Sequence, residues 1–131
     1  MLEFVLGLHS GLRYLVLLAA VVAAGAALLA GRPERPASHA AARTSTIFVA
    51  LLDLQVLVGI VLLVLRGFYP ALMGHVMMML FAAVAAHGFA LVARNRERER
   101  MRPATGLRVG GIVVTLVLVV GGIMAIGKPI L

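Results

Sequence analysis

The chain has 131 residues, of which 63% are hydrophobic and only 13% are charged. A water-soluble domain of this length needs far more polar surface, so the composition excludes one. The formal net charge is +7, but only 5% of the residues are aromatic, which excludes the stacking platforms of a nucleic-acid groove. The chain has no cysteine, which excludes disulfides, thiolate metal sites and a catalytic thiol.

Four apolar stretches are long enough to cross a bilayer as helices, because about 20 residues span roughly 30 Å of hydrocarbon. They cover residues 4–30, 46–65, 71–93 and 109–126. Glycine and proline residues interrupt the chain between them, at 31–36, 67–70 and 103–106. The sequence therefore predicts one all-α domain over residues 1–131, a transmembrane four-helix bundle whose sequential helices are antiparallel.

The positive charges are distributed unevenly between the two ends of this bundle. Nine arginines lie in the connections 31–45 and 94–108, whereas the opposite side has only Arg13, Arg66 and Lys128. Because Lys and Arg favour the cytoplasmic side, both termini are predicted to face outward. The first residues carry no basic segment, so no signal cleavage is expected. The arginine-rich run 94–100 is expected to continue the third helix into the cytoplasm, with ion pairs inside that helix.

Polar side chains inside the spans are the candidate functional residues, since each ionisable one costs about 2.5–3.5 kcal/mol to insert. These side chains are His9, Arg13, Asp53, Gln55, His75 and His87. His9 and His75 each lie about five residues from the outer end of two helices that run in the same direction. Two imidazoles that face each other across a bundle can hold one haem iron from opposite sides.

Neighbouring residues fit such a site. Gly11 and Gly74 would let a macrocycle approach the backbone, and Arg13, on the same helical face as His9, could pair with a haem propionate. The alternatives are interfacial histidines bound to headgroups and glycines that serve only helix packing. The methionines 77–79 are interpreted as packing residues.

The second polar group consists of Asp53, Gln55 and His87, which are predicted to lie at one depth nearer the cytoplasm. Asp53 and His87 are expected to pair, either as a proton-relay step or as an ion pair that holds the bundle together. His75 and His87 are 12 residues apart in the sequence, about 18 Å along a helix, so one metal ion cannot bind both. His87 would serve only a second haem, which is disfavoured because Asp53 and Gln55 are poor haem ligands.

Several short segments resemble small four-helix bacterial membrane proteins described as cytochrome b-like. The similar segments are 9–15 (HSGLRYL), 52–59 (LDLQVLVG), 74–78 (GHVMM) and 86–88 (AHG). The resemblance covers the first three spans, about 90 residues. It implies a bacterial inner-membrane location and haem ligation. In such relatives a histidine is expected two residues before the glutamine of span two, where this chain has Asp53. The resemblance therefore implies one haem, held by the outer pair.

The leading hypothesis is a b-type haem-binding subunit that passes single electrons, rather than a stand-alone enzyme, and no catalytic residues are assigned. Its expected surroundings are membrane lipid, a quinone or redox protein, and a larger respiratory or photosynthetic complex or a homo-oligomer, without nucleic acid. The alternatives are a cofactor-free accessory or scaffolding subunit and a small proton-coupled transporter that uses Asp53 and His87.

Overall fold

The computed structural model describes residues 1–33 and 39–127. It contains four helices: α1 (Leu2–Ala30), α2 (Ala40–Arg66), α3 (Leu72–Arg100) and α4 (Thr105–Ala125). All four are long and apolar enough to cross a membrane. The all-α prediction with four membrane-spanning lengths is therefore confirmed, and Lys128, counted for the orientation, lies outside the described residues.

The helices begin and end where glycine and proline interrupt the apolar sequence. Helix α2 ends at Gly67, whose positive φ of 84° suits a residue without a side chain, and Pro70 precedes the first turn of α3. All four helices extend beyond the predicted spans, α2 and α3 the furthest. Helix α2 starts at Ala40 rather than residue 46, and α3 runs to Arg100. The expected continuation of the third helix through the arginine-rich run is confirmed.

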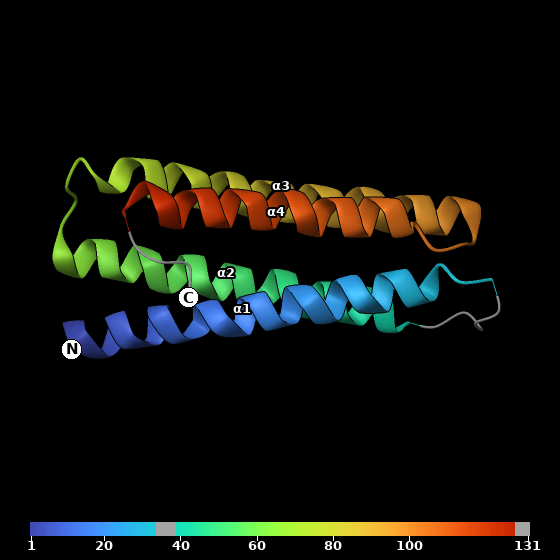
Figure 1. Cartoon of the computed structure of the whole chain (residues 1–131), viewed down its shortest axis with the longest axis horizontal. Helices are drawn as coiled ribbons and strands as arrows, with labels where there is room; N and C mark the ends of the chain where they lie inside the picture. The colour runs from blue at the N-terminus through green and yellow to red at the C-terminus, as the bar shows by residue number, and fades with distance from the viewer. Residues whose placement is uncertain (34–38, 128–131) are drawn as a thin grey trace.

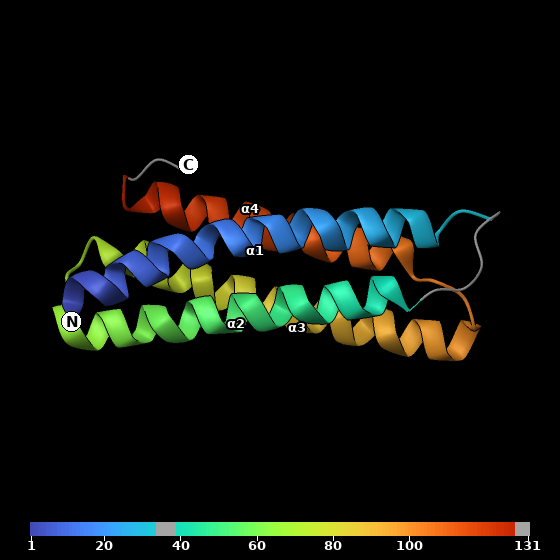
Figure 2. The ribbon, with the colours of Figure 1, turned by 90° about the horizontal axis from the view of Figure 1, so that it is seen from below.

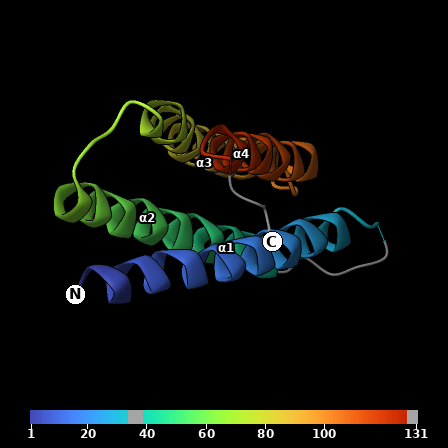
Figure 3. The ribbon, with the colours of Figure 1, turned by 60° about the vertical axis from the view of Figure 1, so that its left-hand side comes forward.

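The helices form two layers, α1 beside α2 and α3 beside α4 (Figures 1 and 2). The N-terminus and the α2–α3 connection lie at one end of the bundle (Figure 1). The C-terminal end of α1, the N-terminal end of α2 and the α3–α4 connection lie at the other (Figure 1). Figure 3 shows the α1–α2 layer and the α3–α4 layer from the side. Chemistry-bearing residues far apart in the sequence can therefore meet wherever the two layers face each other.

The packed core between the layers is rich in small residues. Ala20, Ala23 and Ala82 are fully buried, and the largest buried side chains include Phe48 and Leu52. Small residues allow helix backbones to approach closely in a membrane, where van der Waals packing replaces the hydrophobic drive between helices. The core becomes thinner toward the N-terminal end, where α4 still contributes the buried residues Gly122 and Ile123. Of the described residues, none before Leu12 in α1, after Val58 in α2 or before Ala82 in α3 is buried.

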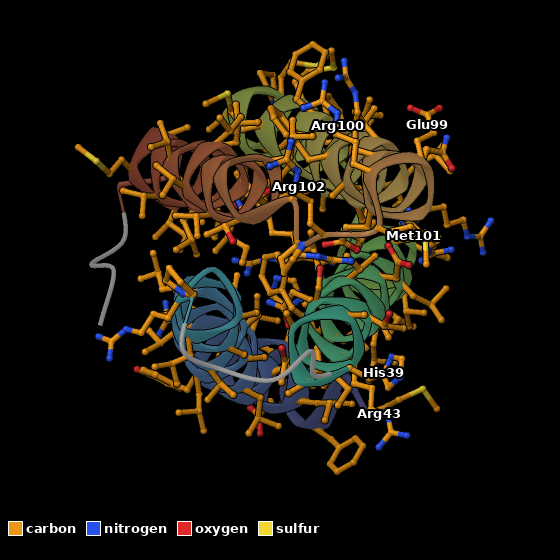
Figure 4. All side chains as sticks on the ribbon, turned by 90° about the vertical axis from the view of Figure 1, so that its right-hand side faces the viewer. His39, Arg43, Glu99, Arg100, Met101 and Arg102 are labelled. Atoms are coloured by element: carbon orange, nitrogen blue, oxygen red, sulfur yellow. The ribbon has the colours of Figure 1, made fainter. Side chains whose placement is uncertain are left out.

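A charged clamp joins α3 to α4 at the opposite end. The Arg108 guanidinium on α4 donates two hydrogen bonds to the Glu97 carboxylate on α3, at 2.7 and 2.6 Å, and the backbone N–H of Ala104 donates to the same carboxylate at 3.1 Å. Glu97 was expected to pair within its own helix, and instead it pairs across to α4. Figure 4 looks onto this end, where the side chains of Arg43, Arg100 and Arg102 lie at the surface.

Candidate functional site: a paired-histidine centre

Residues from all four helices meet near the N-terminal end of the bundle. His9 of α1 and His75 of α3 are the centre of this group, with ring centroids 6.4 Å apart and ring planes at 80°. Both imidazoles are half-buried. Gln55 of α2 and Gly122 of α4 complete the group through hydrogen bonds to these two histidines. The two histidines that the sequence places at one level are therefore neighbours across the two layers.

The orientation of His75 is set by the backbone of α4. Its Nδ1 lies 2.9 Å from the carbonyl oxygen of Gly122. A carbonyl oxygen can only accept, so Nδ1 carries the hydrogen and donates it. In the neutral imidazole the other nitrogen, Nε2, then holds a lone pair. A hydrogen bond from Nδ1–H to a backbone carbonyl is typical of histidines that bind metals through Nε2.

His9 is held through its backbone rather than through its ring. The side-chain amide of Gln55 donates to the His9 carbonyl oxygen at 2.9 Å, whereas its distance to His9 Nε2 is 3.5 Å, the long limit for a hydrogen bond. The other ring nitrogen, Nδ1, is buried and has no hydrogen-bond partner in the described part of the chain. This nitrogen faces Gly59 of α2, since a Cβ added there would lie 3.7 Å from it. A buried polar atom without a partner costs about 1–3 kcal/mol.

Two glycines lie beside the histidines. A Cβ added to Gly59 would lie 3.1 Å from His9 Cε1, so Gly59 makes room for His9. A Cβ added to Gly122 would lie 2.5 Å from Met79 Cε and 3.1 Å from Met78 Cβ, so Gly122 makes room for the methionines of α3. The glycines singled out from the sequence have different surroundings. A Cβ on Gly74 would lie 3.2 Å from the Ala125 side chain, so Gly74 serves the packing of α3 on α4. A Cβ added to Gly11 would meet no atom within 4 Å, so Gly11 is not needed for helix packing at this point.

Arg13 lies one turn after His9 on α1 and is half-buried. Its guanidinium donates a hydrogen bond to the Tyr14 hydroxyl at 2.9 Å and lies 4.8 Å from the centroid of the Tyr14 ring. A cation over an aromatic face is stabilised by the ring quadrupole. The positive charge of Arg13 is thus held within one helical turn of His9.

Asp53 and His87 form the second polar group, and Gln55 does not belong to it. His87 Nε2 lies 2.9 and 3.0 Å from the two carboxylate oxygens of Asp53. Both side chains are on the outside of the bundle, with 58% of His87 and 47% of Asp53 exposed. Gln55 was grouped with this pair from the sequence, but its side chain points to His9 instead.

Sequence reasoning did not find Gly59 and Gly122 as parts of the histidine centre. Gly59 lies one turn after Gln55, so the spacing of a polar residue and a glycine in one span was an available signal. Gly122 contributes a backbone carbonyl, which no side-chain pattern reveals; the Gly121–Gly122 pair in an otherwise apolar span was the only hint.

Over the described ranges 1–33 and 39–127, no group of three or more His, Cys, Asp and Glu residues is arranged to hold a metal ion. Two axial ligands suffice for a haem, because the porphyrin supplies the remaining donors. No family model, curated protein or solved structure matches this chain.

Proposed function

We propose that this chain is a b-type haem-binding membrane subunit that transfers one electron at a time. The observation that carries the proposal is the pair of imidazoles from α1 and α3 with centroids 6.4 Å apart. Two imidazoles that bind one metal ion from opposite sides, at nitrogen–metal distances of about 2 Å, have centroids roughly 6 Å apart. The separation of His9 and His75 therefore suits ligation of one iron between them.

The hydrogen bonds around the two rings also fit this role. His75 keeps Nε2 for a metal because Nδ1 donates to the carbonyl oxygen of Gly122, and this hydrogen bond raises the basicity of Nε2. His9 has a buried ring nitrogen without a partner among the described residues, while Gln55 fixes the backbone beneath it.

In the proposed mechanism the protein positions and insulates the redox group. A bound haem would supply a one-electron couple at its iron. His9 and His75 would hold the haem iron, Gln55 and Gly122 would keep the two histidines in place, and Arg13 would balance the negative charge of a propionate. The apolar helices exclude water from the site. The surrounding solvent therefore has to reorganise little when the charge of the site changes by one electron.

The proposed setting is a bacterial inner membrane, crossed by four antiparallel helices with both termini outside. This orientation rests on the nine arginines of the two connections that would face the cytoplasm. The centre would then lie near the outer surface, where a quinone in the bilayer, a redox protein or a larger complex could exchange electrons with it. One haem is proposed, because His87 is bonded to Asp53 and lies apart from His75 along α3.

The test is a reduced-minus-oxidised visible spectrum of the full chain, purified after haem-replete expression. The wild type is expected to show the bands of a low-spin b-type haem. His9→Ala and His75→Ala should lose them, whereas the matched variants His39→Ala and His87→Ala, with the same substitution at exposed histidines, should retain them. His75→Gly supplied with free imidazole should recover the spectrum, which separates lost ligation from misfolding.

A colourless wild-type protein, or one whose spectrum survives His75→Ala and His9→Ala, would overturn the proposal. A colourless chain that co-purifies with partner proteins in fixed ratio would instead be a cofactor-free accessory subunit.

A further inference from the structure

The ion pair between Asp53 and His87 is placed where a membrane protein rarely leaves polar groups. Asp53 is the middle residue of α2, with 13 residues on either side between Ala40 and Arg66. At 1.5 Å per residue, it lies about 20 Å from both ends of the helix. Any bilayer that this helix crosses therefore has the pair close to its centre, where charged groups normally face the protein interior and pair there.

The pair nevertheless faces away from the bundle core. The buried residues of α2 include Phe48 and Leu52, and Asp53 lies on a different face of the helix, with about half of its side chain exposed. The pair uses His87 Nε2 and shares it between both oxygens of Asp53. A carboxylate accepts up to about four hydrogen bonds, so further acceptor sites and the second ring nitrogen remain for groups outside the bundle.

The surface around the pair suits contact with another helix. Small residues flank both members: Ala50 lies one turn before Asp53 and is exposed, and a Cβ added to Gly88, next to His87, would meet nothing within 4 Å. Small residues let two helix backbones approach closely. Large exposed apolar side chains continue the same faces of the two helices, namely Leu57, Ile60 and Val64 on α2 and Leu80, Val84 and Leu91 on α3.

We propose that a second copy of this chain docks on this α2–α3 face and that the two Asp53–His87 pairs meet at the dimer axis. Most homo-oligomers are two-fold symmetric dimers, in which the same surface faces itself. A two-fold axis along the membrane normal keeps every residue at its own depth. The pair of one copy therefore meets the pair of the other at the same level.

The chemistry of the pair favours a copy of itself as the occupant. One member accepts hydrogen bonds and the other can donate them, so a two-fold rotation sets the imidazole of each copy against the carboxylate of its partner. An unrelated transmembrane helix would satisfy the pair only if it carried a polar group at the same depth. Lipid hydrocarbon carries no such group. The proposal concerns a face distinct from the histidine centre and holds whether or not that centre binds haem.

The absence of cysteine makes disulfide cross-linking of single-cysteine variants a direct test. In the proposed dimer α3 of one copy faces α2 of the other, so the test combines two single-cysteine chains. Val84→Cys lies one turn from His87 and Leu57→Cys one turn from Asp53, with 71% of Val84 and 57% of Leu57 exposed. Val117→Cys on α4 replaces Val84→Cys in the matched control, because Val117 is 63% exposed and lies at a similar depth: α3 and α4 are antiparallel, with Gly111 packed against Phe89. In oxidised native membranes, co-expressed Val84→Cys and Leu57→Cys chains should form a disulfide-linked dimer, whereas Val117→Cys chains co-expressed with Leu57→Cys chains should stay monomeric.

A second measurement isolates the polar pair. Single-molecule photobleaching of the labelled full chain in liposomes gives the dimer dissociation constant. Asp53→Leu removes the acceptor and should raise this constant by about 5- to 30-fold, the effect expected for one interhelical polar contact. A monomeric wild type, equal cross-linking of the Val84→Cys and Val117→Cys chains, cross-linking of the Val117→Cys chain only, or an unchanged dissociation constant in Asp53→Leu would each overturn the proposal. So would a monomeric chain whose Val84→Cys variant cross-links only to a different protein.

Discussion

Replacing Gly111 with alanine should destabilise the protein through a single added methyl group. Gly111 is buried on α4 and packs directly on Phe89 of α3. An added Cβ would lie 2.8 Å from Cγ of Phe89 and still closer to its Cβ. The Cβ of Phe89 is fixed to the backbone of α3, so a change of side-chain rotamer cannot relieve this contact and the two helices must move apart.

The magnitude follows from the cost of overpacking a close-packed core, about 1–3 kcal/mol for each inserted group. A loss of that size lowers the ratio of folded to unfolded protein by roughly 5- to 150-fold. The free energy of unfolding can be measured by titrating the protein in mixed micelles with a denaturing detergent. The shift in α3 relative to α4 should also weaken the His75–Gly122 hydrogen bond, which joins the same two helices.

Gly110→Ala is the matched control. Gly110 is adjacent on the same helix, and a Cβ there would meet nothing within 4 Å. Because alanine favours a helix by up to about 1 kcal/mol over glycine, this variant should be as stable as the wild type or more so. In a double-mutant cycle, Phe89→Gly should remove most of the penalty of Gly111→Ala. If Gly111→Ala proves as harmless as Gly110→Ala, the reasoning from helix contact is wrong.

Three further outcomes are expected. Glu97→Gln should cost about 1–3 kcal/mol of unfolding free energy, because it leaves the Arg108 side chain, only 4% exposed, without its carboxylate; an unchanged detergent midpoint would contradict this. Glu97 lies beyond the apolar segment 71–93, and the hydrogen bond from Arg108 holds the pKa of Glu97 below its ordinary value. The stabilising contribution of Glu97 should therefore be present above its unfolded pKa and be lost as the pH falls through its folded pKa. If the detergent midpoint of Glu97→Gln falls with decreasing pH as steeply as that of the wild type, the assignment is refuted. Gln55→Leu should broaden or shift the haem spectrum without abolishing it, since Gln55 holds the His9 backbone and His9 would remain to bind; complete loss of the spectrum in a folded variant would show a more direct role.

The basic features of the fold were predictable from local sequence. Runs of about 20 apolar residues predict helices that cross a membrane, because backbone groups in hydrocarbon must be bonded within the segment. Glycine and proline marked the helix ends to within a few residues. The polar residues in the apolar spans could be singled out from the sequence, because their insertion is costly wherever they point.

The partners of those residues were less predictable. Gln55 and Asp53 are two residues apart and were assigned to one group, yet Gln55 reaches His9 whereas Asp53 reaches His87. Residues two apart in a helix point about 200° apart around its axis, so they meet different neighbours. Glu97 was likewise expected to bond within α3 and bonds to Arg108 of α4 instead.

The sequence by itself determined that this chain forms four apolar helices and which few residues carry chemistry. Only the tertiary structure decided which helix faces look inward, and hence that His9 and His75 meet while Asp53 and His87 face outward. The physical reason is that α2 and α3 are apolar over most of their circumference. A soluble helix shows its inner side by a hydrophobic stripe, but a helix between lipid and core has similar residues on both sides. Its rotation is set by the shapes of its neighbours, such as Gly111 against Phe89, which no local pattern encodes.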